Sequence, residues 1–112
     1  MTHEQYEAVA GELMALARDI ELAKRPGYTN GADDVLVNFK RVAERTGLTP
    51  GQVLAVYLLK HVDAITALMT RPDLPVAEAA QGRFSDAINY LRLGYALWHE
   101  AQDAKRPITK GE

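Results

Sequence analysis

Several features that define other protein classes are absent from this sequence of 112 residues. There is no cysteine, which excludes disulfide frameworks, zinc ribbons, thiol nucleophiles and iron–sulfur centres. Neither sign of charge dominates, since 13 basic side chains stand against 15 acidic ones, and a general nucleic-acid-binding surface would need a basic excess. The longest apolar run, Val53 to Leu59, is too short to cross a bilayer, and the first residues lack the pattern of a secretory signal. We therefore expect one soluble, cytoplasmic domain that binds neither membranes nor nucleic acids in general.

Helical periodicity dominates what the sequence does contain. Apolar residues recur every three or four positions, and no strand-like alternation is long enough to compete. The pattern predicts an all-α fold, a compact bundle of four main helices in a single domain over residues 1–105, followed by a polar tail over 106–112. The first helix is expected over residues 1–24, ended by Pro26 and Gly27, and the second from Asp33 or Asp34 to Thr46, ended by Gly47. The third is expected over 50–70, where Thr49, Pro50 and Gln52 give the start signal. The fourth is expected over 83–104, and a short extra helix at 76–81 could precede it, before a weak point at Gly82.

Two of these helices carry apolar faces that predict their place in the bundle. Apolar residues cover more than half the circumference of the third helix, which predicts that it lies at the centre. The last helix carries a stripe at i, i+4, i+7, i+11 and i+14, and Ala87 and Gly94 beside the stripe would let another helix approach closely. Because most of the stripe is aromatic, core packing is favoured for it. The stripe consists of Phe84, Ile88, Leu91, Tyr95 and Trp98.

A few polar residues lie against apolar faces, and these are the first candidates for a site. Asp86 sits at the edge of the packed surface of the last helix, where burial of a carboxylate is costly unless a cation or a metal compensates it. Asn89 lies one turn further along, so an acid and an amide could converge on one ligand. Lys60 interrupts the apolar third helix and could reach a carboxylate or a phosphate. Two structural alternatives stay open, an ordinary surface pair of Arg83 with Asp86 and a buried pair of Lys60 with Asp86.

The segment from Lys24 to Gly31 combines two basic residues, an aromatic ring, two glycines, a hydroxyl and an amide. Such a mixture can hold a phosphate and stack a base, although ordinary turns have the same composition. It matches no phosphate-loop motif, and the sequence contains neither a serine nucleophile elbow nor a zinc-protease motif. His61 falls among leucine and isoleucine side chains, which predicts a hydrogen-bonded core residue rather than a metal ligand.

Taken in order, the polar residues form a pattern with a known counterpart. It runs Lys24, Tyr28-Thr29-Asn30, Asn38-Phe39, Lys60-His61, Glu78, Arg83, Asp86 and Asn89-Tyr90. Over residues 22–98 it resembles small all-α phage and prophage proteins of the nucleotide-modification-associated type, formerly a domain of unknown function. Gly27 departs from that family, which usually has an acidic residue before the tyrosine. The resemblance implies one pocket in which Tyr28 or Tyr90 stacks on the ligand, surrounded by Lys24, Tyr28, Asn38, Lys60, Asp86 and Asn89.

A more distant similarity is to MazG-like all-α nucleoside triphosphate pyrophosphatases, whose helices carry pairs of acids for magnesium. Magnesium takes carboxylates grouped on facing helices, together with water and substrate phosphates. Glu4 and Glu7 have the i,i+3 spacing of such a pair, and Glu78 and Asp86 would have to supply the opposite side. However, Glu4 and Glu7 lie off the apolar stripe of their helix, so the sequence equips this alternative poorly.

These observations together predict a phage-type protein that binds a nucleotide-like small molecule without a cofactor, and that handles or sequesters it. A signalling nucleotide made by host defence is one such ligand, in which case the protein acts in the host cytoplasm. We expect a homodimer or a higher homo-oligomer. Two alternatives remain, a magnesium-dependent pyrophosphatase-like enzyme and a structural or protein-interaction bundle. Binding is favoured over catalysis because the sequence offers cations and hydrogen-bonding groups but no evident nucleophile or metal cluster.

Overall fold

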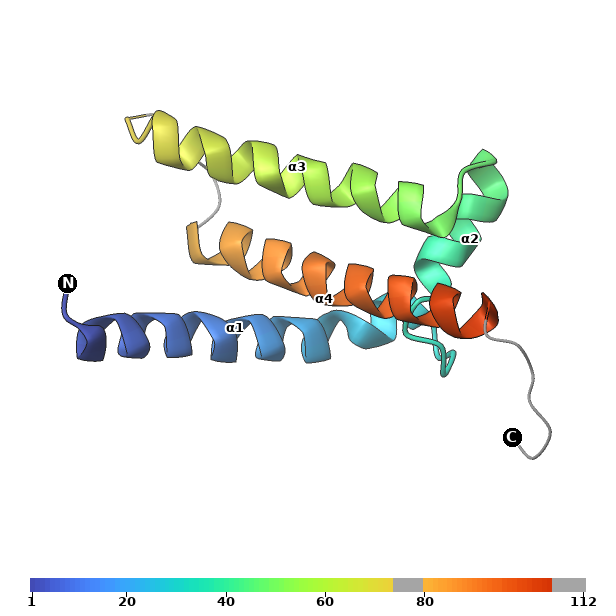
Figure 1. Ribbon diagram of the computed structural model, residues 1–112, viewed down its shortest axis with the longest axis horizontal. Coiled ribbons are helices and arrows are strands. Elements are labelled where there is room, and N and C mark those ends of the chain that lie inside the picture. Colours follow the sequence, from blue (N-terminus) through green and yellow to red (C-terminus); the bar gives the residue numbers. More distant parts are fainter. Residues whose placement is uncertain (74–79, 106–112) are drawn as a thin grey trace.

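The computed structural model describes residues 1–73 and 80–105, and within these ranges it contains four α-helices and no strand (Figure 1). This confirms the predicted all-α helical bundle. The expected tail at 106–112 and most of the expected extra helix, 76–79, lie outside the described residues. The helices are α1 (His3–Thr29), α2 (Val37–Thr46), α3 (Pro50–Thr70) and α4 (Ala80–Lys105).

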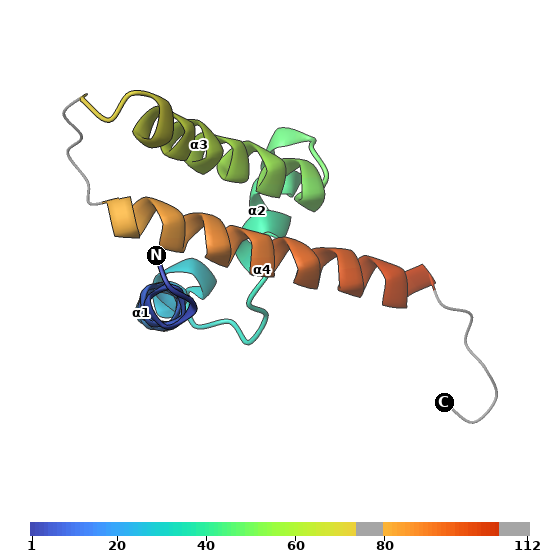
Figure 2. The same ribbon diagram turned by 60° about the vertical axis from the view of Figure 1, so that its left-hand side comes forward.

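The central helix of the bundle is α4. It lies between α1 and α3 in both views (Figure 1, Figure 2) and contacts each of them, whereas α1 and α3 do not touch each other within the described ranges. α2 packs on α3 and also touches α1. The prediction that the third helix is central is therefore wrong. An apolar circumference shows how much of a helix could be buried, but here α2 and α4 cover only one side of α3.

Both predicted capping boxes are present. Thr2 and Gln5 satisfy each other's backbone N–H groups at the start of α1, and Thr49 and Gln52 do the same at the start of α3. The bounds of α3 agree with those predicted. By contrast, α4 begins at Ala80 and runs through Gly82 without a break, because a glycine weakens a helix without necessarily ending it.

α1 extends beyond its predicted end. It continues through Pro26 to Thr29, since a proline removes one backbone donor and little helix remains after it to depend on that bond. The Thr29 hydroxyl donates to the backbone carbonyl one turn earlier (3.1 Å), and Asn30 ends the helix with a left-handed backbone (φ 50°). As a result, Tyr28 lies on the helix, one turn after Lys24, instead of in the expected loop.

α2 begins at Val37, later than predicted, because Asp34 caps the turn before it. The Asp34 carboxylate accepts hydrogen bonds from the Leu36 backbone N–H (2.9 Å) and from the Lys40 ammonium (2.6 Å). Lys40, and then the Leu36 N–H, hold the pKa of Asp34 below its usual value. Lys40 also lies 2.8 Å from Glu100 of α4, so Asp34 first and Glu100 second raise the pKa of Lys40. These contacts tie α2 to α4.

The core lies between α2, α3 and α4. Phe39 of α2 turns its ring edge toward Tyr57 and Tyr90, with 6.3 Å between ring centroids in each case. Tyr90 also stacks on Tyr57 (5.9 Å) and on His61 (5.1 Å), so His61 is a buried core residue as predicted. We call Phe39, Tyr57, His61 and Tyr90 the inner aromatic group. The buried apolar residues beside it are Leu36, Ala43, Val53 and Leu97.

Small residues let α3 approach α4 closely. A β-carbon added to Gly94 would lie 2.6 Å from Leu54 Cδ2, so this glycine is where the two helices come together, as predicted. Alanine residues lie on the same side of α4 as Gly94, one or two heptads from it. The repeat consists of Ala80, Ala87, Gly94 and Ala101.

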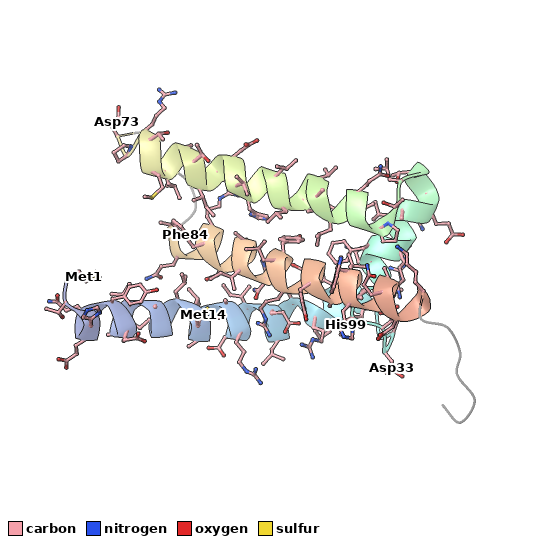
Figure 3. All side chains as sticks on the ribbon, viewed as in Figure 1. Met1, Met14, Asp33, Asp73, Phe84 and His99 are labelled. Atoms are coloured by element: carbon pink, nitrogen blue, oxygen red, sulfur yellow. The ribbon has the colours of Figure 1, made fainter. Side chains whose placement is uncertain are left out.

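The aromatic stripe predicted to be core lies largely on the surface, so that prediction is wrong. Leu91, Tyr95 and Trp98 are more than half exposed, and Phe84 and Ile88 are only half-buried. The stripe follows α4 from Phe84, near its start, to the turn that holds His99 (Figure 3). Phe84 lies beside Leu13 and Leu16 of α1, whereas Leu91, Tyr95 and Trp98, further along α4, are left exposed by the described helices.

α3 also exposes much of its apolar surface. Its longest uninterrupted apolar run is short, but the helix as a whole is long and apolar enough, by length and composition alone, to cross a membrane. Only 11% of its apolar stretch is buried. A helix of this composition in a small bundle is normally covered on more than one side.

Candidate functional site

A pocket opens between the C-terminal half of α1, the start of α2 and the middle of α4. The space between its lining side chains, counted out into the open solvent at its mouth, is about 560 Å³. Its apolar wall is formed by Ile20, Val35, Phe39 and Leu93. Its polar wall is formed by Glu21, Lys24, Arg25, Thr29, Asn38, Asp86 and Asn89, with the rings of Tyr28 and Tyr90 between the two.

The structure brings together six of the seven predicted binding residues in this pocket, namely Lys24, Tyr28, Asn38, Asp86, Asn89 and Tyr90. It does not bring Lys60 there. α3 contributes no residue to the pocket wall, and Lys60 lies exposed on that helix. The face pattern showed that Lys60 is close to apolar neighbours, but not that α4 would separate it from the pocket.

Asp86 pairs with Lys24 across the gap between α4 and α1. The Lys24 Nζ lies 3.6 Å from the Asp86 Oδ1, so the partner of this carboxylate is not the Lys60 of the buried-pair alternative. A charge-assisted hydrogen bond of this kind is normally 2.7–2.9 Å long. Because the two groups attract each other without a close hydrogen bond, both retain bonding capacity for a ligand between them.

Asn89 presents an oxygen that no described residue satisfies. Its side chain is 93% buried, and its Nδ2 donates to the Ala17 backbone carbonyl of α1 (2.8 Å). A carbonyl can only accept, so this bond fixes which end of the amide faces α1 and turns Oδ1 away from it. Oδ1 is buried and accepts no hydrogen bond from residues 1–73 and 80–105. An unsatisfied buried acceptor costs about 1–3 kcal/mol, which a ligand with an N–H or O–H donor would recover.

The two pocket tyrosines differ in what they offer a ligand. Tyr90 already stacks on Tyr57 and His61. Burial raises the pKa of Tyr90 to about 12, helped by the nearby Tyr28 and Asp86, so its hydroxyl stays neutral and can donate. Tyr28 is more exposed and contacts no other ring in the described part of the chain. Of the two, Tyr28 is the ring available for stacking.

Glu21 and Arg25 complete the polar wall, and the sequence reasoning missed their role. The Arg25 guanidinium holds the Glu21 carboxylate through Nη2, at 2.6 and 2.7 Å. Their i,i+4 spacing on the first helix was the sequence signal that could have predicted this ion pair. With Lys24 and Asp86, the wall carries two cations and two anions, so its formal charge is zero. Such a wall suits a neutral ligand, or one with a single anionic group, better than a triphosphate.

The acids of the magnesium alternative do not meet in the described structure. Within residues 1–73 and 80–105, no three histidine or acidic side chains are grouped as metal ligands would be. Glu4 and Glu7 are exposed near the start of α1, about 20 Å or more along the helix from the pocket. Glu78 lies outside the described residues. The alternative stays a prediction.

No family model matches the chain, and neither a curated protein nor a solved structure matches it in comparison. The resemblance to nucleotide-modification-associated proteins therefore stays a prediction. What the pocket can bind has to follow from its own geometry.

Proposed function

We propose that this protein binds a nucleoside-like or nucleotide-like ligand in the pocket between α1, α2 and α4. The ligand would place a planar ring against Tyr28 and a hydrogen-bond donor on Asn89 Oδ1. A phosphate or other anionic group would meet Lys24. Asp86 would accept a hydrogen bond from a ribose hydroxyl or a base edge, so that each polar group of the pocket has a matching group on one small molecule.

The observation that carries this proposal is the buried, unsatisfied Oδ1 of Asn89, in a pocket wall that also contains the ring of Tyr28, which stacks on no other ring in the described part of the chain. Buried polar groups are nearly always hydrogen-bonded, so an unpaired acceptor in a pocket wall is consistent with a partner on a ligand. The zero formal charge of the wall supports a nucleoside, a monophosphate or a cyclic nucleotide over a triphosphate. Binding without turnover is consistent with sequestration, and in a phage this would remove a nucleotide, including a defence signal, from the host.

A ligand screen tests the proposal directly. We expect nucleosides, monophosphates or cyclic nucleotides to raise the melting temperature, since a ligand at 100 times its dissociation constant stabilises the folded state by about 2.7 kcal/mol. The same screen with magnesium and a pyrophosphate-release assay addresses the enzyme alternative, which predicts turnover of triphosphates. Stabilisation by none of these compounds would favour the structural bundle and contradict the proposal.

Matched variants show whether binding occurs in this pocket. We expect Asn89→Ala to weaken binding about 10-fold or more, while the free energy of unfolding changes by no more than about 1 kcal/mol, since the variant also removes an unsatisfied oxygen. Ser85→Ala is the control, because Ser85 is fully buried one turn earlier on α4 and lies outside the pocket wall. Equal binding by the Asn89→Ala protein and the wild type would contradict the proposed site.

Lys24 has a matched control on another helix. Lys24→Ala should weaken binding of a phosphate-bearing ligand about 10-fold, as expected for the loss of one charged hydrogen bond, and should affect the corresponding nucleoside less. Lys60→Ala removes the same charge from an exposed position outside the pocket and should leave binding unchanged. Equal losses in both variants would indicate a general electrostatic effect and count against a phosphate at Lys24.

A further inference from the structure

A second region, separate from the pocket, is a broad apolar face formed by α3 and α4. We call it the outer face. On α3 it includes Val62 and Met69, which are 42% and 70% exposed. On α4 it includes Leu91, Tyr95 and Trp98, which are 59%, 67% and 57% exposed.

The packing places both halves of the outer face on one side of the molecule. Leu54 and Gly94 mark the line along which α3 and α4 meet. Tyr57 and Tyr90 lie on the side of this line that faces Phe39 of α2. Because successive residues of a helix are rotated by about 100°, the outer-face residues of α3 and α4 lie on the opposite side of this contact line from Tyr57 and Tyr90. The outer face therefore points away from α2, whereas the pocket opens toward it.

The chain leaves more surface exposed than a compact protein of its mass does. Its accessible surface is 8405 Å² with residues 74–79 and 106–112 included, whereas a compact protein of 12.4 kDa exposes about 6,100 Å². A stable homodimer of standard size covers about 800 Å² on each partner. Monomers rarely leave a continuous apolar patch of several large side chains in water.

We infer that the outer face is covered by a second copy of this chain, in a two-fold dimer whose centre is a four-helix bundle of two α3 and two α4 helices. A two-fold axis parallel to the helices places α3 of one protomer over α4 of the other. All neighbouring helices are then antiparallel, which is the usual arrangement of such bundles.

The two halves of the outer face are complementary in size. The α4 half is bulky, with Tyr95 stacked on Trp98 at 6.1 Å between ring centroids. The α3 half carries no aromatic ring and consists of aliphatic side chains, among them Ala55 and Val62, with Met69 near the end of the helix. Placing α3 over α4 sets the large rings of one protomer against the small side chains of its partner. Stacked aromatic rings are typical anchors of protein interfaces, since little freedom is lost when they are buried.

The charged residues of α3 argue against a lipid bilayer as the cover. Lys60 and Asp63 lie at the middle of the helix and are exposed. If α3 crossed a membrane, both would lie at the centre of the hydrocarbon layer, where charged side chains are strongly disfavoured. In the dimer they lie away from the outer face and stay in water.

Mass and fluorescence together test the dimer. We expect sedimentation equilibrium of the wild type to give twice the 12.4 kDa chain mass at high concentration. Trp98 is the only tryptophan, so its emission reports on this face alone, and it should shift to longer wavelength as dilution releases monomers. A wild type that is monomeric at all concentrations, or whose emission does not change with association, would overturn the inference.

Charge substitutions locate the interface. Tyr95→Glu and Val62→Glu, on the two halves of the outer face, should each raise the dimer dissociation constant at least about 30-fold, as at an interface hot spot. Tyr6→Glu is the control, because Tyr6 is an equally exposed aromatic residue on α1, away from this face, and it should leave the dimer intact.

Circular dichroism checks that each variant is folded, and because the two substitutions lie on different helices, a folding failure in one leaves the other as a test. Dimers that persist in both folded variants would overturn the inference. Flotation of the wild type with phosphatidylcholine vesicles, in preference to dimerisation, would overturn it as well. Since the pocket lies on the opposite side, ligand binding and dimerisation can each fail without the other.

Discussion

α4 contributes to two aromatic groups whose surroundings differ. The inner aromatic group surrounds Tyr90, whose ring contacts Phe39, Tyr57 and His61 from two other helices. The outer pair, Tyr95 and Trp98, lies one to two turns further along, and these rings stack on each other and remain mostly exposed. The inner group holds the protomer together, whereas the outer pair contributes to stability only when another surface covers it.

The largest expected effect comes from breaking the inner group. Phe39→Ala should lower the free energy of unfolding by about 3–5 kcal/mol, because the ring is buried where three helices meet. Tyr95→Ala should change it by no more than about 0.5 kcal/mol when the protein is dilute enough to be monomeric. Chemical denaturation monitored by circular dichroism measures both. Comparable losses in the two dilute variants would show that the outer pair is packed within the protomer.

A pair of glycines sharpens the comparison between the packed and open parts of α4. Gly94→Ala should lower the free energy of unfolding by about 1–3 kcal/mol, because the new methyl group meets Leu54. Gly82→Ala, in the same helix with nothing within 4 Å, should instead raise it by about 0.5–1 kcal/mol.

The effect of Gly94→Ala has an internal check. Combining it with Leu54→Ala should cost less than the sum of the two single variants, since the second substitution makes room for the added methyl group. Thermal or chemical unfolding of all four proteins completes the cycle. Strict additivity would mean that the two helices do not meet at Leu54 and Gly94.

Alkaline pH distinguishes Tyr90 from a tyrosine in water. Its pKa is about 12 in the folded protein and 10.0 when unperturbed, so between these values the unfolded chain loses a proton that the folded chain retains. Stability should therefore fall as the pH rises from 10 to 12, and Tyr90→Phe should make that fall shallower by up to about one proton. Urea denaturation at several pH values measures the slope. An unchanged slope would show that Tyr90 is not protected from ionisation.

The smallest effect is expected at the ion pairs that tie α2 to α4. Lys40→Ala should cost about 0.5–1 kcal/mol, because Lys40 bridges Asp34 and Glu100 at the surface. Asp34 contributes to the free energy of unfolding above its usual pKa, and this contribution is lost as the pH falls through the lowered pKa of the folded state. The stability difference between Lys40→Ala and the wild type should therefore shrink in acid. Lys60→Ala is the control. A cost that persists at pH 2 would indicate lost packing instead of lost charge.

Part of the pocket could be predicted from sequence because Lys24, Asp86 and Asn89 are polar residues on periodic helix faces, whereas Tyr28 came from the composition of residues 24–31 and Asn38 only from the family resemblance. Six of the seven proposed residues line it. The prediction that failed, Lys60, depended on how the helices are arranged and not on a local sequence pattern. Lys60 has apolar neighbours on its own helix, yet α4 separates it from the pocket. The free oxygen of Asn89 could not be predicted either, because it depends on a bond to Ala17, 72 residues earlier in the chain.

The sequence alone determined where two of the four helices begin, through the capping boxes at Thr2 and Thr49, and where two of them pack closely, through Gly94. These features depend on neighbours within a few residues, so local chemistry is enough to specify them. Only the tertiary structure decided which apolar faces are covered. Periodicity gives a helix an apolar side but not a partner, and the same kind of stripe is buried at Phe39 and exposed at Trp98 because three helices meet at one and none reaches the other.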